Sequence, residues 1–188
     1  MTAIVAFWES KLHYGIAADR QVTSEDGSVF YARKLYKHKD VVIGVSGDST
    51  VGLCAEAVIE AVKRRKTGSF KRPITEAWCQ VVRGLMLDPI GENDRKRGGD
   101  LRMLMVSPYG LYYFDASAGG YVEEICGRTD DIDDVAMYTI GSGGPDAYRY
   151  LENRSKDEGN LRTALKLACR ANLFCSGGPD VEVFGEPG

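Results

Sequence analysis

The first 47 residues of the chain alternate between apolar, strand-forming runs and short polar turns. Residues 3–8 and 12–18 flank a polar turn at 9–11, and residues 29–36 and 41–46 flank a second turn at 37–40. Apolar runs of this length between turn residues are typical of β-hairpins. The sequence therefore predicts two hairpins at the start of the chain, against which the rest must pack.

The remainder of the chain alternates between helical and strand patterns. Apolar residues at helical spacing predict helices over residues 49–62, 75–87, 144–153 and 161–174, with Ser49 capping the first and Pro73 preceding the second. Strand patterns occupy residues 101–107, 111–115, 121–125, 137–140 and 181–184. This alternation predicts an α+β fold in which helical layers cover both faces of a two-sheet sandwich.

Composition narrows the class of protein. A chain of 188 residues is predicted to form one domain, residues 1–188, which is long enough to bury a core. The net charge of −3 argues against a nucleic-acid-binding or membrane-surface protein, and no run approaches the ~20 apolar residues that span a bilayer. Five cysteines without a Cys-x-x-Cys pair favour reduced thiols in a cytoplasmic protein over disulfides or zinc.

No cofactor or metal site is predicted. The acidic run at 130–134 lacks the glycine and the bidentate glutamate of a calcium loop. The glycine-rich run at 141–144 lacks the Lys-Ser/Thr pair of a nucleotide-binding loop. His13 and His38 stand beside charged residues in strand runs, which predicts surface positions for both.

Four residues occur in an order that suggests a hydrolase using its own N-terminus: Thr2, Asp19, Lys34 and Gly47. A threonine hydroxyl is a poor nucleophile until a base takes its proton, and a free α-amine on the same residue, with a pKa near ~8, can serve. Positive charge on Lys34 would favour the alkoxide, and Asp19 would hold the lysine in place. The N–H of Gly47 would face the developing oxyanion.

Each of these residues also has a simpler interpretation. Many proteins begin with Met-Thr by chance, so a threonine at position 2 needs no function. Asp19 fits a residue that caps a turn. Lys34 would be one strand lysine in a basic region that also contains Arg33, Lys37 and Lys39. The order of the four residues, each in a strand-and-turn context, favours the catalytic interpretation.

The ordered set resembles the proteasome β-type subunits and the bacterial HslV peptidase, which are N-terminal-nucleophile hydrolases. The resemblance places Thr2 on the nucleophile, Asp19 on the acidic partner, Lys34 on the active-site lysine and Gly47 on the oxyanion glycine. The run Gly141-Ser142-Gly143-Gly144-Pro145 is similar to the family's Gly-Ser-Gly motif, which places Ser142 on its supporting serine. The resemblance spans about the whole chain and implies a four-layer αββα sandwich.

The chain also departs from the family pattern. Spacing slips by about one position on either side of Asp19, which a hairpin of different length would absorb. The family's acidic residue near the end of its last helix has its nearest counterpart at Asn172, and its metal-ion loop is not recognisable at residues 175–178. Met1 precedes Thr2, so the amine of Thr2 becomes free only after Met1 is removed.

The resemblance implies a threonine-type peptidase that cleaves unfolded polypeptides inside a self-compartmentalised, homo-oligomeric ring in the cytoplasm. Because no nucleotide site is recognisable, any ATP-dependent unfoldase must be a separate protein. The main alternative is a catalytically inactive proteasome-like subunit that serves as scaffold or gate. An amidase of the same superfamily that acts on a small molecule is a third alternative.

Overall fold

The computed structural model of the protein describes residues 2–23, 26–47, 51–64, 71–87, 101–116, 121–126, 135–171 and 176–185. Its strands are β1 (Ile4–Ser10), β2 (His13–Ala18), β3 (Gln21–Thr23), β4 (Val29–Tyr31), β5 (Leu35–His38), β6 (Val41–Ser46), β7 (Arg102–Ser107), β8 (Gly110–Asp115), β9 (Tyr121–Cys126), β10 (Ala136–Ile140) and β11 (Asp180–Phe184). Its helices are α1 (Val51–Arg64), α2 (Lys71–Leu87), α4 (Gly144–Leu151) and α5 (Glu158–Ala171). The described chain therefore combines helices and strands, as the sequence predicts.

The described strands form two antiparallel sheets and a separate ribbon. One sheet has the order β10-β1-β2-β11, the other has the order β5-β6-β7-β8-β9, and β3 pairs with β4 alone. Ile4 at the start of β1 lies opposite both Ala18 and Ile140, which are the last residues of β2 and β10. Asp180, the first residue of β11, also lies opposite Ala18. Residues far apart in the sequence thus meet at one end of the four-stranded sheet.

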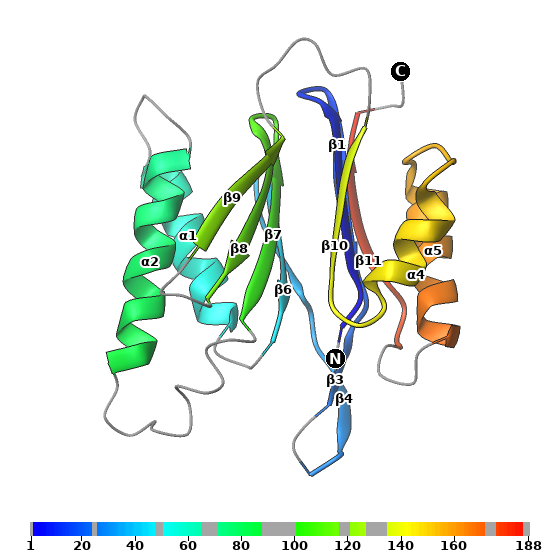
Figure 1. Cartoon of the computed structure of the whole chain (residues 1–188), viewed down its shortest axis with the longest axis horizontal. Coiled ribbons are helices and arrows are strands. Elements are labelled where there is room, and N and C mark those ends of the chain that lie inside the picture. Colours follow the sequence, from blue (N-terminus) through cyan, green and yellow to red (C-terminus); the bar gives the residue numbers. More distant parts are fainter. Residues whose placement is uncertain are drawn as a thin grey trace.

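The two sheets lie side by side with helices on their outer sides (Figure 1), and three apolar clusters hold these elements together. Along β1, Ile4 and Ala6 pack between the two sheets, whereas Val5 and Phe7 point to the opposite side and pack against α4 and α5. Ile43 of β6 belongs to a third cluster, which includes residues of α1 and α2. Helices α1 and α2 therefore cover the outer face of the five-stranded sheet, and α4 and α5 cover that of the four-stranded sheet.

The run at residues 29–36 forms two strands instead of the single strand that the sequence suggests. Val29–Tyr31 pairs with Gln21–Thr23, a strand that the sequence analysis misses, whereas Leu35–His38 pairs with β6. The β3–β4 ribbon projects from the sheets (Figure 1), so the chain must leave one ladder before it joins the next. Residues 32–34 make this change of direction, and Lys34 is the last of them.

Two helices begin earlier than the sequence predicts. Helix α2 begins at Lys71 and includes Pro73, because a proline in the first turn lacks an N–H that would have no helical partner there. Helix α5 begins at Glu158, because the Asp157 carboxylate accepts a hydrogen bond of 2.8 Å from the Asn160 N–H and caps the helix. The predicted cap Ser49 and the counterpart residue Asn172 lie outside the described residues.

His13 is buried, contrary to the surface position that its charged neighbours suggest. Its ring lies 4.9 Å from that of Phe7, and its Nδ1 is paired with the Glu9 carboxylate.

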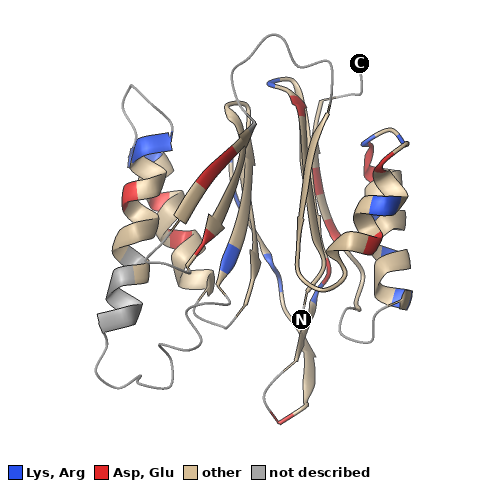
Figure 2. Ribbon diagram, viewed as in Figure 1, with Lys and Arg blue, Asp and Glu red and all other residues tan. Residues whose placement is uncertain are grey.

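The charged residues on the helices are seen in Figure 2, where Lys, Arg, Asp and Glu mark α1, α2, α4 and α5. No helix in the described ranges has the length and apolar character needed to cross a membrane.

Candidate active site

Lys34 is a buried lysine that directly precedes β5, after the chain has left the β3–β4 ribbon. Its side chain is 6% exposed, whereas its basic neighbours Arg33, Lys37 and Lys39 are exposed. The Lys34 Nζ donates hydrogen bonds to Thr2 Oγ1 at 2.9 Å and to Asp19 Oδ1 at 2.8 Å. Burial of an ammonium group is costly unless such partners compensate it, so the position of Lys34 differs from that of an ordinary strand lysine.

Asp19 follows the last residue of β2 and is completely buried. Besides the bond from Lys34, its Oδ1 accepts a hydrogen bond of 2.8 Å from the Ala3 N–H, and its Oδ2 accepts one of 3.0 Å from the Gln21 N–H. The Asp19 N–H donates in turn to the Ala3 carbonyl oxygen at 3.0 Å. These bonds fix the carboxylate between the start of β1 and the start of β3, where it accepts the hydrogen bond from Lys34.

Thr2 is 5% exposed and lies between Lys34 and the turn that joins β10 to α4. Its carbonyl oxygen accepts a hydrogen bond of 3.3 Å from the Gly143 N–H. Gly141 has a φ of +85°, and a Cβ built on it would lie 2.0 Å from the Thr2 carbonyl oxygen. Only glycine fits this position, since both the backbone conformation and the space exclude a side chain. Ser142 lies between the two glycines and is exposed.

Gly47 directly follows β6 and has a φ of +130°, a conformation that favours glycine. The end of β6 lies beside the candidate site, because the Val45 N–H donates to the Lys34 carbonyl oxygen at 3.0 Å. Within the described residues, neither Gly47 nor Ser142 makes a hydrogen bond to the Thr2 side chain.

The structure thus brings three of the five predicted site residues into direct contact, namely Thr2, Asp19 and Lys34. The turn that carries Ser142 contacts the backbone of Thr2, whereas Gly47 makes no backbone hydrogen bond to Thr2 within the described residues.

The groups that fix the candidate site through the backbone are not recognisable from the sequence. The N–H groups of Ala3 and Gln21 bind Asp19, and no side-chain pattern reveals them. Gly141 is recognisable from the sequence, because two glycines on either side of a single residue, directly before a helix, mark a tight turn. Among the described residues, no group of three or more His, Cys, Asp or Glu side chains could hold a metal ion.

Comparison with known proteins identifies the fold. No protein-family model matches the sequence, and no curated protein matches it. Among solved structures, HslV from Trypanosoma brucei is 22% identical with a TM-score of 0.66, and the match covers 98% of this chain and 99% of HslV. BPH from Thiobacillus denitrificans is 18% identical with a TM-score of 0.70, covering 98% of each chain. BPH also has a structure in complex with epoxomicin, with a TM-score of 0.68.

A third protein of the same fold is Anbu from Hyphomicrobium sp. strain MC1, 14% identical, with a TM-score of 0.65 over 98% of this chain and 82% of Anbu. The chain therefore has the fold of HslV and proteasome-type N-terminal-nucleophile hydrolases, and the resemblance read from its sequence is confirmed. At these identities the comparison establishes the fold, so the function depends on the residues of the site.

Proposed function

We propose that the chain is the subunit of a threonine-type peptidase, with Thr2 as the nucleophile once Met1 has been removed. The observation that carries the proposal is the buried contact of Lys34 with both Thr2 Oγ1, at 2.9 Å, and Asp19 Oδ1, at 2.8 Å. A cation held beside a hydroxyl favours the alkoxide that attacks a carbonyl carbon. The shared fold with HslV and BPH supports the same reaction class.

In the proposed reaction, Thr2 Oγ attacks the carbonyl carbon of the scissile peptide bond while the α-amine of Thr2 takes the hydroxyl proton. The tetrahedral intermediate collapses to an ester on Thr2, and the proton passes to the departing amine of the substrate. Water then hydrolyses the ester and restores the hydroxyl. Each bond that breaks is matched by one that forms, and no cofactor is required.

The other site residues act around this nucleophile in the proposal. Lys34 stabilises the attacking oxygen, Asp19 orients Lys34, and Ser142 supports the hydrogen bonding of the Thr2 amine. The Gly47 N–H binds the oxyanion, where one donor is typically worth roughly 3–4 kcal/mol. The positive φ of Gly47, which glycine adopts without strain, allows a tight turn directly after β6 of the kind that can present an N–H to a substrate.

The finer features of the fold and the assembly belong to the same proposal. We assign the chain, residues 1–188, to one domain with the four-layer αββα sandwich of this superfamily, on the basis of its two sheets and the helices that cover them. Copies assemble into a closed ring that encloses the Thr2 sites and admits only unfolded polypeptides. A cytoplasmic location fits five cysteines without a Cys-x-x-Cys pair.

The alternative is an inactive scaffold or gating subunit, and the N-terminus distinguishes the two. The experiment is the intact mass of the purified protein before and after treatment with a peptide epoxyketone, which needs both a hydroxyl and a free amine on one residue. We expect loss of Met1 and one adduct on Thr2. Thr2→Ala should take no adduct, whereas the control Thr163→Ala, on the exposed face of α5, should react fully. An unlabelled wild-type protein supports the scaffold.

A separate ATP-dependent unfoldase follows from an enclosed site, because a folded substrate cannot reach Thr2 inside a ring. The pure protein should cleave short peptides without ATP and leave a stable fluorescent protein intact. Loss of fluorescence on incubation with the pure protein alone would contradict an enclosed site.

A further inference from the structure

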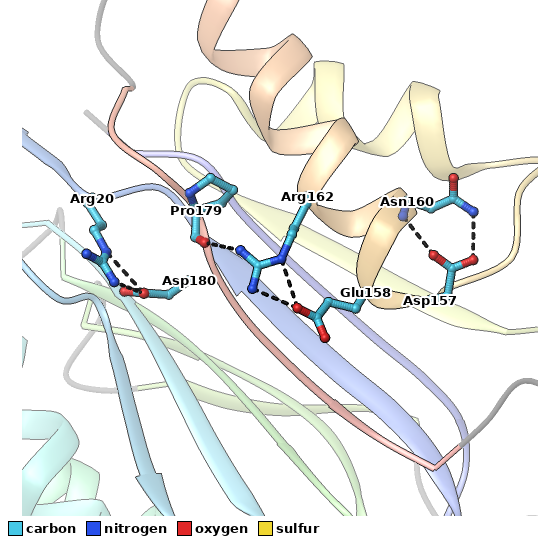
Figure 3. A network of polar contacts seen from close by, with 7 residues as sticks. All are labelled: Arg20, Asp157, Glu158, Asn160, Arg162, Pro179 and Asp180. Carbon is cyan, nitrogen blue, oxygen red and sulfur yellow. Dashed lines mark hydrogen bonds and ion pairs between the residues drawn. The ribbon is translucent and has the colours of Figure 1, made fainter.

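We propose that a relay of polar contacts from helix α5 to the residue after Asp19 is a positioning device for the candidate active site. The relay consists of Arg162, Pro179, Asp180 and Arg20, and is called the α5 clamp below (Figure 3). The inference rests on the proposed function, because it assigns the clamp a role in orienting Asp19 toward Lys34 and Thr2.

Arg20 is the point at which the clamp meets the site. Its Nε donates to Asp180 Oδ1 at 3.0 Å, and its Nη2 donates to the same oxygen. Its backbone is held as well, because its N–H donates to the Ser176 carbonyl oxygen at 3.2 Å and its carbonyl oxygen accepts from the Ala32 N–H at 2.9 Å. Arg20 is therefore fixed through its side chain and through both of its peptide groups.

The other end of the clamp is anchored on α5. Arg162 Nη1 donates to the Pro179 carbonyl oxygen at 2.9 Å, and its Nε and Nη2 donate to Glu158 Oε1 at 2.9 and 2.7 Å. Glu158 belongs to the first turn of the same helix, so it holds the guanidinium in the direction of Pro179. Figure 3 shows Arg162 between Glu158 and Pro179, with Asp180 and Arg20 beyond.

The clamp acts where β2 ends. Asp180 lies opposite Ala18 in the ladder, and Asp19 and Arg20 are the two residues that follow Ala18 before β3 begins. A fixed Arg20 therefore sets the direction in which the chain leaves β2, and with it the direction of the Asp19 carboxylate. A small misplacement of a supporting group lowers the rate of the chemical step without removing substrate binding. This is the signature by which a positioning residue is recognised.

The test compares two truncations on one strand. Asp180→Ala removes the clamp, and Glu182→Ala is the matched control, since Glu182 lies two positions further along β11 and is ion-paired with Lys37 instead. We expect Asp180→Ala to lower kcat for a fluorogenic peptide about ten- to hundredfold with KM within about twofold. Glu182→Ala should change neither constant by more than about twofold.

A second pair of variants separates positioning from loss of folding. Arg20→Lys keeps a cation that can reach Asp180, whereas Arg20→Ala does not. We expect Arg20→Lys to retain kcat within about fivefold of the wild type, and Arg20→Ala to match Asp180→Ala. Equal kcat values for Asp180→Ala and Glu182→Ala, or equal losses in both Arg20 variants, would overturn the proposal.

A stability measurement tests the clamp independently of catalysis. In a double-mutant cycle of Asp180→Ala with Lys34→Met, followed by urea unfolding, the two effects should be less than additive, because without Lys34 there is no contact left to position. The cycle of Glu182→Ala with Lys34→Met should be additive. If the changes in the free energy of unfolding are additive in both cycles, the clamp proposal is wrong, even where the enzyme is active. If the wild type does not react with the epoxyketone but coupling appears in the first cycle only, the peptidase proposal is wrong and the clamp is supported.

Discussion

Lys34 and Thr2 are 32 positions apart in the sequence, yet the Lys34 Nζ lies 2.9 Å from the Thr2 Oγ1 in the protein interior. The same Nζ lies 2.8 Å from Asp19 Oδ1, so one ammonium group connects the start of β1 with the end of β2. An arrangement with both charges buried costs desolvation, and it is retained where it serves a site or specifies a structure. This relationship underlies the first prediction.

Lys34→Ala should reduce peptide hydrolysis nearly as far as Thr2→Ala does, because coupled groups fail together when a central member is lost. It should also destabilise the fold by about 3–5 kcal/mol, since Asp19 then remains buried without its partner. Asp19→Asn should be milder, because an amide oxygen still accepts from the Ala3 N–H. Peptide assays and urea unfolding test both effects, with the exposed Lys37→Ala as control. Near-normal turnover in Lys34→Ala would show that Lys34 is only structural.

Gly141→Ala should displace Thr2. A Cβ at this position would lie 2.0 Å from the Thr2 carbonyl oxygen, and the φ of +85° adds strain of about 1–3 kcal/mol for a residue with a side chain. We expect a lower free energy of unfolding and little or no epoxyketone labelling. The matched control is Gly178→Ala, since a Cβ on Gly178 meets no atom within 4 Å. Similar labelling of the two variants would mean that the 141–143 turn does not hold the nucleophile.

Alkaline pH should destabilise the fold through Tyr14. Burial, followed by the charge of Asp40, raises the pKa of Tyr14 above the ordinary value near ~10. The unfolded chain therefore releases this proton first, so the stabilisation is complete below about pH 10 and is lost as the pH rises toward the folded pKa. Burial and then Asp115 raise the pKa of Tyr113 in the same direction.

The measurement is urea unfolding of the wild type and of Tyr14→Phe at pH 9 and pH 11. These two values lie on either side of the ordinary tyrosine pKa of about 10. Tyr14→Phe loses the hydrogen bond of 3.0 Å to the Asp40 carbonyl oxygen, so it should be less stable by about 1 kcal/mol at neutral pH. Its loss of stability between the two pH values should be smaller than that of the wild type. Equal losses would contradict the assignment to Tyr14.

Assembly into a closed ring is the fourth prediction. The enclosed site that we propose requires such an assembly, and most soluble homo-oligomers have closed point-group symmetry. Native mass spectrometry and sedimentation at micromolar concentration should show a defined multiple of the monomer mass. A protein of monomer mass at every concentration would contradict the ring and, with it, the enclosed site.

The fold was predictable wherever a local pattern determines the structure. Apolar alternation predicts most strands within one or two residues, and helical spacing predicts the four described helices. The break at residues 32–34 was not predictable, because Val29–Tyr31 has strand propensity whichever partner it finds. Its side chains are exposed, and its backbone pairs with that of β3 in a ribbon, so the choice of partner depends on tertiary structure.

The site was predictable as far as side-chain chemistry in a fixed order can show it. Thr2, Asp19 and Lys34 meet as expected from the resemblance, but their catalytic roles stay a prediction, as do those of Gly47 and Ser142. The backbone donors that hold Asp19, and the relay through Arg20 and Asp180, depend on strand register. Register is set by pairing across the whole sheet, so no local segment carries that information.

The most direct test of the central claim is the mass of the protein's N-terminal peptide after treatment with a peptide epoxyketone. We expect a peptide that begins at Thr2 and carries one adduct, no adduct in Thr2→Ala, and loss of peptide hydrolysis in parallel. A protein that keeps Met1 quantitatively, or a Thr2→Ala variant that cleaves peptides at the wild-type rate, would contradict the assignment of Thr2 as the nucleophile.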